Sequence, residues 1–130
     1  MKSKGFTFIE MLVVVTIIGV LSAVGVANFK VANQKARDGR RQGDLQQIRA
    51  SLELYRTDLN VYPITGDLSS LSPTYIQTIP SDPVSGNLYS YESDGKTYTL
   101  CSTLELSAAA VTDCGSCGTA TCRYKITNPL

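Results

Sequence analysis

Residues 6–29 read FTFIEMLVVVTIIGVLSAVGVANF, and this stretch decides the fold. Glu10 is its single charged residue, because residues 11–29 carry no charge at all. At about 1.5 Å per residue, a helix over 11–29 is about 28 Å long, close to the roughly 30 Å hydrocarbon core of a bilayer. Its apolar residues leave no polar face, and a chain of 130 residues hardly provides a core that would surround it. The stretch therefore predicts a membrane-spanning helix.

An ordinary secretory signal peptide is the alternative interpretation. Lys2 and Lys4 form a short basic start, and Gly25-Val26-Ala27 has the small residues of a cleavage site. The apolar region of such a peptide is shorter, about 7–15 residues, and gains nothing from a buried glutamate. A lone carboxylate in an apolar span costs roughly 2.5–3.5 kcal/mol on insertion scales, so Glu10 requires a partner or a purpose. We therefore favour the retained helix.

The residues after the apolar stretch have the pattern of an amphipathic helix. Apolar side chains recur at spacings of three and four: Leu45, Ile48, Leu52, Tyr55 and Leu59. No proline occurs before Pro63. The pattern predicts one long helix that starts near Phe6 and ends near Asn60. Its first half needs lipid or other copies of the chain around it, and its second half needs a small domain against the apolar stripe.

Residues 61–130 predict that small domain. Pro63 breaks the helix and opens a polar loop over 61–88, which four apolar residues pin down, with one short helical turn: Leu68, Leu71, Tyr75 and Ile76. Residues 89–93 and 96–101 alternate as strands around Asp94-Gly95, a preferred two-residue hairpin turn. That turn pairs Tyr91 with Tyr98 and Tyr89 with Leu100. With a third strand over 121–127, the fold class is α+β: a long helix on a small antiparallel sheet.

The four cysteines fall within the last thirty residues, at Cys101, Cys114, Cys117 and Cys122. An even number in a small, loop-rich domain favours disulfides formed in an oxidising compartment. The alternative is a zinc site, because Cys114 and Cys117 have ligand spacing, but only one such pair is present. Of the three connectivities, we predict Cys101–Cys122 across the second and third strands, which leaves Cys114–Cys117.

Composition offers little to catalysis or to a cofactor. The chain has no histidine, scattered acids, and no phosphate-binding loop, nucleophile elbow or histidine-containing metal motif. We predict no enzyme, no cofactor and no metal site. Six basic residues form a collar after the apolar stretch, with Asp38 and Asp44 among them: Lys30, Lys35, Arg37, Arg40, Arg41 and Arg49. The collar suits anionic headgroups or DNA, or it is a solvated helix face.

The segment Lys4-Gly5-Phe6-Thr7-Phe8-Ile9-Glu10-Met11-Leu12 resembles the recognition segment of the type IV pilin and pseudopilin family. In that family, prepilin peptidase cuts after the glycine and methylates the new amine, which here implies Gly5 and Phe6 as the processing site. Glu10 then neutralises the amine of a neighbouring subunit during assembly. Residues 80–83 and 87–89 are similar to a stretch of the major pseudopilins of type II secretion systems. Many family members have proline where this chain has Ala27, and we assign no calcium site.

The resemblance implies four parts: a leader over 1–5, a transmembrane half-helix over 6–29, an amphipathic half-helix over 30–60 and a pilin-like β domain over 61–130. It also implies a filament subunit, either of a type IV pilus or of a secretion pseudopilus, that polymerises with itself on an inner-membrane assembly platform. By the positive-inside rule the collar would stay in the cytoplasm. We follow the cysteines instead and place the C-terminal domain outside. A tethered protein that binds DNA or lipid without polymerising is the alternative.

Overall fold

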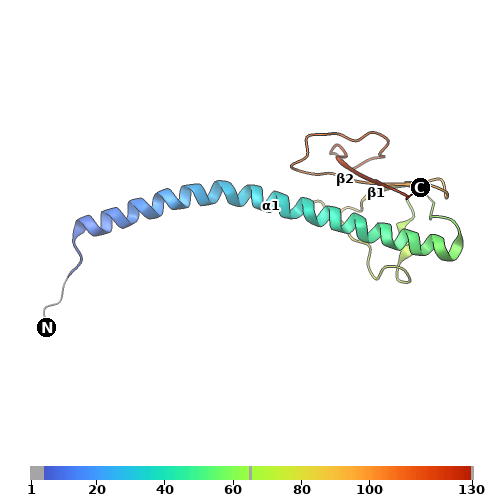
Figure 1. Ribbon diagram of the computed structural model, residues 1–130, viewed down its shortest axis with the longest axis horizontal. Coiled ribbons are helices and arrows are strands. Elements are labelled where there is room, and N and C mark those ends of the chain that lie inside the picture. The colour runs from blue at the N-terminus through green and yellow to red at the C-terminus, as the bar shows by residue number, and fades with distance from the viewer. Residues whose placement is uncertain (1–4, 65, 130) are drawn as a thin grey trace. The chain divides into compact units, whose positions relative to one another are not determined.

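The computed structural model describes residues 5–64 and 66–129, without the side chains of residues 26 and 27. It contains α1 (Phe8–Leu59), the 3-10 helix η1 (Leu68–Leu71), and the strands β1 (Ser90–Ser93), β2 (Tyr98–Ser102) and β3 (Tyr124–Thr127) (Figure 1). The predicted α+β fold, a long N-terminal helix and a three-stranded antiparallel sheet, is confirmed. Of the leader predicted over 1–5, all but Gly5 lies outside the described residues.

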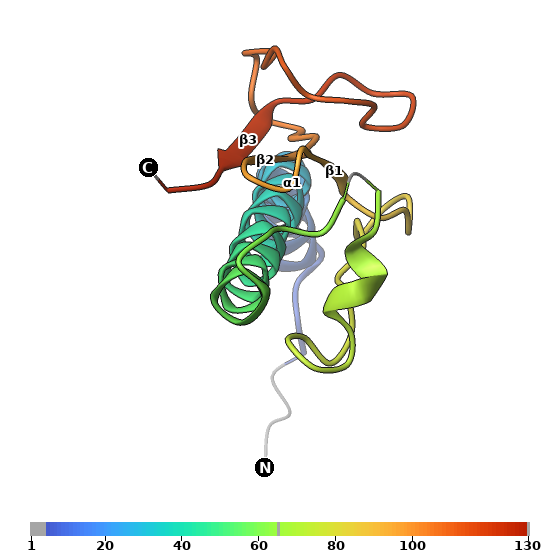
Figure 2. The ribbon, with the colours of Figure 1, turned by 90° about the vertical axis from the view of Figure 1, so that its right-hand side faces the viewer.

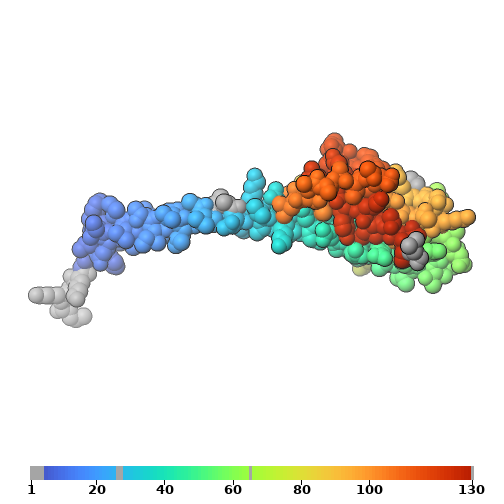
Figure 3. All heavy atoms as spheres, turned by 45° about the horizontal axis from the view of Figure 1, so that its top comes forward, coloured from blue at the N-terminus to red at the C-terminus, as the bar shows by residue number. Residues whose placement is uncertain are grey.

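The chain divides into two compact units, residues 1–34 and residues 35–130. The first unit holds the apolar half of α1, which is long and apolar enough to cross a membrane and has no buried residue in its apolar window. Its large side chains, such as Ile17 and Leu21, are exposed on every side. In Figure 3 this stretch of helix has no other segment over the face shown, whereas later residues cover α1 in the second unit.

The core of the second unit forms where the sheet meets the predicted stripe of α1. Leu45, Ile48 and Leu52 are fully buried, and they pack with Tyr98 and Leu100 of β2. Figure 2 looks along α1 and shows the sheet over one side of the helix and the loop containing η1 beside it. That loop is held as predicted, because Leu68, Leu71 and Ile76 are buried and Tyr75 packs against the core.

The prediction of a buried stripe is wrong at one residue, Leu59. Leu59 is 52% exposed, although it has the spacing of the buried residues before it. The helix ends at Leu59, and Asn60 follows with a φ of 58°, which turns the chain back toward the sheet. Tyr62 then fills the place beyond Leu52, with its ring 4.7 Å from that of Tyr98.

The register of the predicted hairpin is also wrong, by two residues. Tyr91 lies opposite Leu100 and Ser93 opposite Tyr98, so the connection is the four-residue loop 94–97 and not a two-residue turn. The Asp94 carboxylate selects this loop, because it accepts hydrogen bonds from the backbone N–H groups of Lys96 at 2.8 Å and Thr97 at 2.6 Å. A slip of two residues keeps every side chain on its face, so the apolar face is unchanged.

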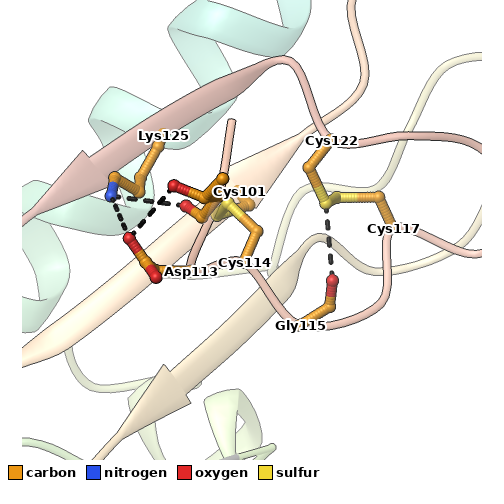
Figure 4. Close-up of a disulfide and its surroundings, with 8 residues drawn as sticks. Cys101, Asp113, Cys114, Gly115, Cys117, Cys122 and Lys125 are labelled. Carbon is orange, nitrogen blue, oxygen red and sulfur yellow. Dashed lines mark hydrogen bonds and ion pairs between the residues drawn. A yellow bond between two sulfur atoms is a disulfide. The ribbon is translucent and has the colours of Figure 1, made fainter. Parts of the chain in front are cut away.

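The predicted pairing of the cysteines is wrong as well. The disulfides join Cys101 to Cys114 and Cys117 to Cys122, with Cα atoms 6.0 and 5.5 Å apart (Figure 4). The partner of Cys101 in β3 is Lys125, because β3 begins only at Tyr124 and Cys122 precedes the strand. Cys101 therefore forms its disulfide with Cys114, in the segment that precedes β3. Both bridges staple the segment between β2 and β3.

Candidate functional site

The first turn of α1 holds the one acid of the apolar stretch. The backbone N–H of Thr7 donates to Glu10 Oε2 at 2.8 Å, and the Thr7 hydroxyl donates to the same oxygen at 2.7 Å. Thr7 precedes the first helical residue, and the Glu10 carboxylate accepts its backbone N–H, which is one half of a capping box. The carboxylate is thereby partly satisfied within its own chain. The sequence analysis missed Thr7, although the Thr-x-x-Glu spacing indicates it.

The surroundings of Glu10 are apolar. Glu10 lies beside a shallow hollow on the surface of α1 with Phe6, Ile9, Val13 and Val14. Phe6 is 79% exposed and Ile9 is 67% exposed, so no part of the described chain covers this surface. The structure thus brings the predicted processing residue Phe6 and the predicted assembly residue Glu10 to one apolar surface.

Gly5 is not required by the packing of its own chain. A Cβ atom at this position would have no neighbour within 4 Å, and the residue is exposed. Because the fold of the chain imposes no limit on side-chain size there, any demand for a small residue must come from another molecule.

A group of paired charged side chains lies in the second unit. Arg41 is only 3% exposed, and its guanidinium contacts three carboxylates: Asp82 at 2.6 Å, Asp38 at 2.9 Å and Glu105 at 3.0 Å. Arg37 adds a two-point contact to Glu105, at 2.7 and 2.5 Å. We call these five residues the Arg41 cluster. It joins α1 to the loop before β1 and to the segment after β2.

The electrostatics of the Arg41 cluster follow from these contacts. Hydrogen bonds from Arg37, and then from Arg41, lower the pKa of Glu105 to about 2. Burial alone would raise the pKa of Asp82, but hydrogen bonds from Arg41 and from the backbone N–H groups of Ser85 and Val84 lower it well below its usual range. Burial likewise opposes the charge of Arg41, and the hydrogen bonds from its guanidinium to the acids raise its pKa nonetheless. All these groups are therefore charged near neutral pH.

The cluster corrects the predicted basic collar. Two of its six residues, Arg37 and Arg41, are committed to ion pairs inside the chain. Two of their acids, Asp82 and Glu105, lie far away in the sequence and were missed. Asp38 also accepts the backbone N–H groups of Glu105 and Leu106 at 2.9–3.0 Å, which no local pattern indicates.

The predicted cysteine site is a pair of disulfides in which all four cysteines take part. Within residues 5–64 and 66–129, no group of three or more His, Cys, Asp or Glu side chains is arranged to hold a metal ion.

Comparison with known proteins bears on both units. Residues 1–26 match the prokaryotic N-terminal methylation motif. Type II secretion system core protein G of Vibrio cholerae serotype O1 is 34% identical over 113 residues, which cover 76% of this chain and 77% of that protein. The protein of the same name from Escherichia coli strain K12 is 34% identical over 110 residues, covering 73% and 75%.

The chain belongs to this family of major pseudopilins. A third member, type II secretion system core protein G of Pseudomonas aeruginosa, is 34% identical over 109 residues, covering 72% of this chain and 76% of that protein. No solved structure matches the chain. Membership in the family and the apolar half of α1 suit anchoring in the inner membrane with an exported domain.

Proposed function

We propose that the chain is a structural subunit of a secretion pseudopilus that polymerises through the first half of α1. The observation that carries the proposal is Glu10, a carboxylate at the start of a helix that is apolar and uncovered on every side. Such a helix is not stable in water alone, so lipid surrounds it before assembly and other copies of the helix surround it afterwards. The names of the relatives support the secretion-type filament over a type IV pilus.

Processing supplies the charge that Glu10 needs. We propose that prepilin peptidase cuts between Gly5 and Phe6 and that the new amine is methylated. A positive amine on Phe6 of one subunit then approaches the Glu10 carboxylate of its neighbour in an apolar medium, where opposite charges attract strongly. The capping contact from Thr7 holds the carboxylate at the helix start in the meantime. Identical subunits joined head to tail in this way build an open helical fibre.

The rest of the chain supplies the exported part of the subunit. We propose that residues 35–130 lie outside the cytoplasm, where the two disulfides form, and that the basic residues after the span do not dictate the orientation. The Arg41 cluster supports this, because its acids offset Arg37 and Arg41. The partners are the chain itself, the peptidase, membrane lipid and an inner-membrane assembly platform.

A tethered protein that binds DNA or lipid without polymerising is less well supported. Its basis was the six-residue collar, and in the structure the charges of Arg37 and Arg41 are paired with acids of the same chain. Lys30, Lys35 and Arg40 remain exposed without an ion pair among the described residues, which is too little for a groove that tracks a phosphate backbone.

The mass of the native protein tests the processing step. We expect a mature chain that begins at Phe6 and carries one methyl group on its amine. Because Gly5 has open space around it, Gly5→Ala should be cut and a bulky residue at this position should block cutting without unfolding the exported domain. Intact-mass spectrometry of protein purified from membranes measures this, and a chain that starts at Met1 or near Asn28 would contradict the proposal.

A further inference from the structure

Arg40 and Asp58 are a cation and an anion of α1 in the second unit that have no ion-pair partner among the described residues. Both are exposed. Lys35 is a further exposed cation of this unit without an ion pair, but it lies about 140° around the helix from Arg40 and Asp58. Asp58 accepts one hydrogen bond, from the Tyr75 hydroxyl at 3.0 Å. The two residues are eighteen positions apart, which is five turns of 3.6 residues, so they lie on the same side of the helix about 27 Å apart. At that distance they do not pair with each other.

On this side of α1, the exposed residues between the two charges have small or uncharged side chains: Gly43, Gln47, Ala50 and Leu54. Ser51, which lies nearly in line with the two charges, is buried. A Cβ atom added at Gly39 or Gly43 would meet nothing within 4 Å, so no other segment of the described chain lies over the Arg40 end of this face, whereas Tyr75 contacts Asp58 at the other end. Figure 2 shows the same arrangement, with the sheet and the loop containing η1 on two sides of α1 and a bare side opposite them. A face with opposite charges at its two ends is complementary to the same face of a parallel copy that is shifted along the helix and turned by half a turn about the axis between them.

We propose that this face docks on a second, parallel copy of the chain displaced by about 27 Å along α1, so that Arg40 of one copy pairs with Asp58 of the next. The inference rests on the proposed function, because a filament of identical subunits provides parallel copies shifted along one axis. Each copy offers Arg40 to one neighbour and Asp58 to another, so the contact repeats along the fibre without closing into a ring.

Other charges on the helix are poorer candidates for this role. Arg41 and Arg37 are held in the Arg41 cluster. Glu53 already accepts hydrogen bonds from the hydroxyls of Tyr62 and Tyr98 at 3.0–3.1 Å. Arg49 has no ion pair among the described residues but lies away from Asp58 around the helix, at a spacing of nine residues. Arg49 is therefore the matched control.

A charge-reversal experiment on the full chain tests the pairing. Filaments are sheared from cells that make the chain together with its assembly machinery, and the yield is quantified by immunoblot and electron microscopy. Arg40→Glu and Asp58→Lys should each lower the yield about tenfold, because like charges then meet at every contact along the fibre. The double variant Arg40→Glu/Asp58→Lys should return the yield to within about twofold of the native chain, as expected for a directly coupled pair.

The control is Arg49→Glu combined with Asp58→Lys, which should stay as low as Asp58→Lys alone. Thermal unfolding of each purified variant in detergent shows whether it folds; for a variant that does not, the neutral changes Arg40→Gln and Asp58→Asn replace it, and each should lower the yield severalfold. Normal yields from the single variants, or a double variant that is not restored, would overturn the pairing while leaving the filament intact. Absence of filaments from the native chain would instead contradict the proposed function, and this inference with it.

Discussion

Arg41 is the residue through which the loops of residues 35–130 are joined to α1. Its guanidinium forms ion pairs with one acid of its own helix, Asp38, and with two acids of distant segments, Asp82 and Glu105. A buried ion group of this kind stabilises a fold only while every member is charged and paired. Asp82 also accepts two backbone N–H groups at 2.9 Å, so the loop before β1 is built around the same contact. The ion pairs of Arg41 therefore determine how these two loops join the helix.

This cluster predicts how stability depends on pH. The folded pKa of Glu105 is about 2, below its ordinary value of 4.5, so its contribution is complete above about pH 4.5 and is lost as the pH falls toward 2. The pKa of Asp82 is lowered as well, with the same sign. We expect the unfolding temperature to be constant from pH 7 to pH 5 and to fall below pH 5. Near-UV circular dichroism of the buried tyrosines measures the unfolding temperature at each pH. Glu105→Gln should lower the unfolding temperature at pH 7 and reduce the fall; an unchanged fall would contradict the assignment.

At the scale of elements, the segment between β2 and β3 depends on its staples. Residues 103–123 contain no strand or helix, and the two disulfides join this segment to β2 and to itself. The bridges join successive cysteines along the chain, so each closes a short loop. Disulfides across loops of this size contribute about 2–4 kcal/mol each. The segment also carries Glu105, so the bridges hold an acid of the Arg41 cluster in place.

Single cysteine variants test this connectivity. Cys101→Ser should leave one free thiol, and alkylation followed by tandem mass spectrometry should find the label on Cys114, because the structure pairs these two residues. Cys117→Ser is the matched variant and should place the label on Cys122. A label on Cys122 in the Cys101→Ser chain would contradict this pairing and support the cross-strand disulfide Cys101–Cys122 instead. Loss of either bridge should lower the unfolding temperature of the exported domain and leave the helical content of α1 unchanged.

At the scale of the whole molecule, the sequence predicts those parts that depend on local pattern. The spacing of Leu45, Ile48 and Leu52 gives the buried face of α1, and alternation gives β1 and β2. The leader motif points to Glu10 directly. Contacts between distant segments escape this reasoning, because nothing near Arg41 in the sequence indicates Asp82 or Glu105. The hairpin register depended on the hydrogen bonds of the Asp94 side chain, and the disulfide pairing depended on where β3 begins.

In the proposed filament, Glu10 joins subunits and does not maintain the fold of its own chain. Within the described residues, the Glu10 side chain is hydrogen-bonded to Thr7 alone, so Glu10→Leu should leave a folded, membrane-inserted protein. Removing the charge should ease insertion, since it removes a burial cost of roughly 2.5–3.5 kcal/mol. Thr7→Val is the matched control, because it removes only the hydroxyl and leaves the charge of Glu10 in place.

The most direct measurement is the yield of sheared filaments from cells that carry Glu10→Leu, set beside the amount of variant protein in the membrane. We expect normal membrane levels of the Glu10→Leu chain, cleavage before Phe6 and no filaments, whereas Thr7→Val should retain assembly. Filaments at the native yield from the Glu10→Leu chain would contradict this expectation, because the carboxylate would then have no part in joining one subunit to the next.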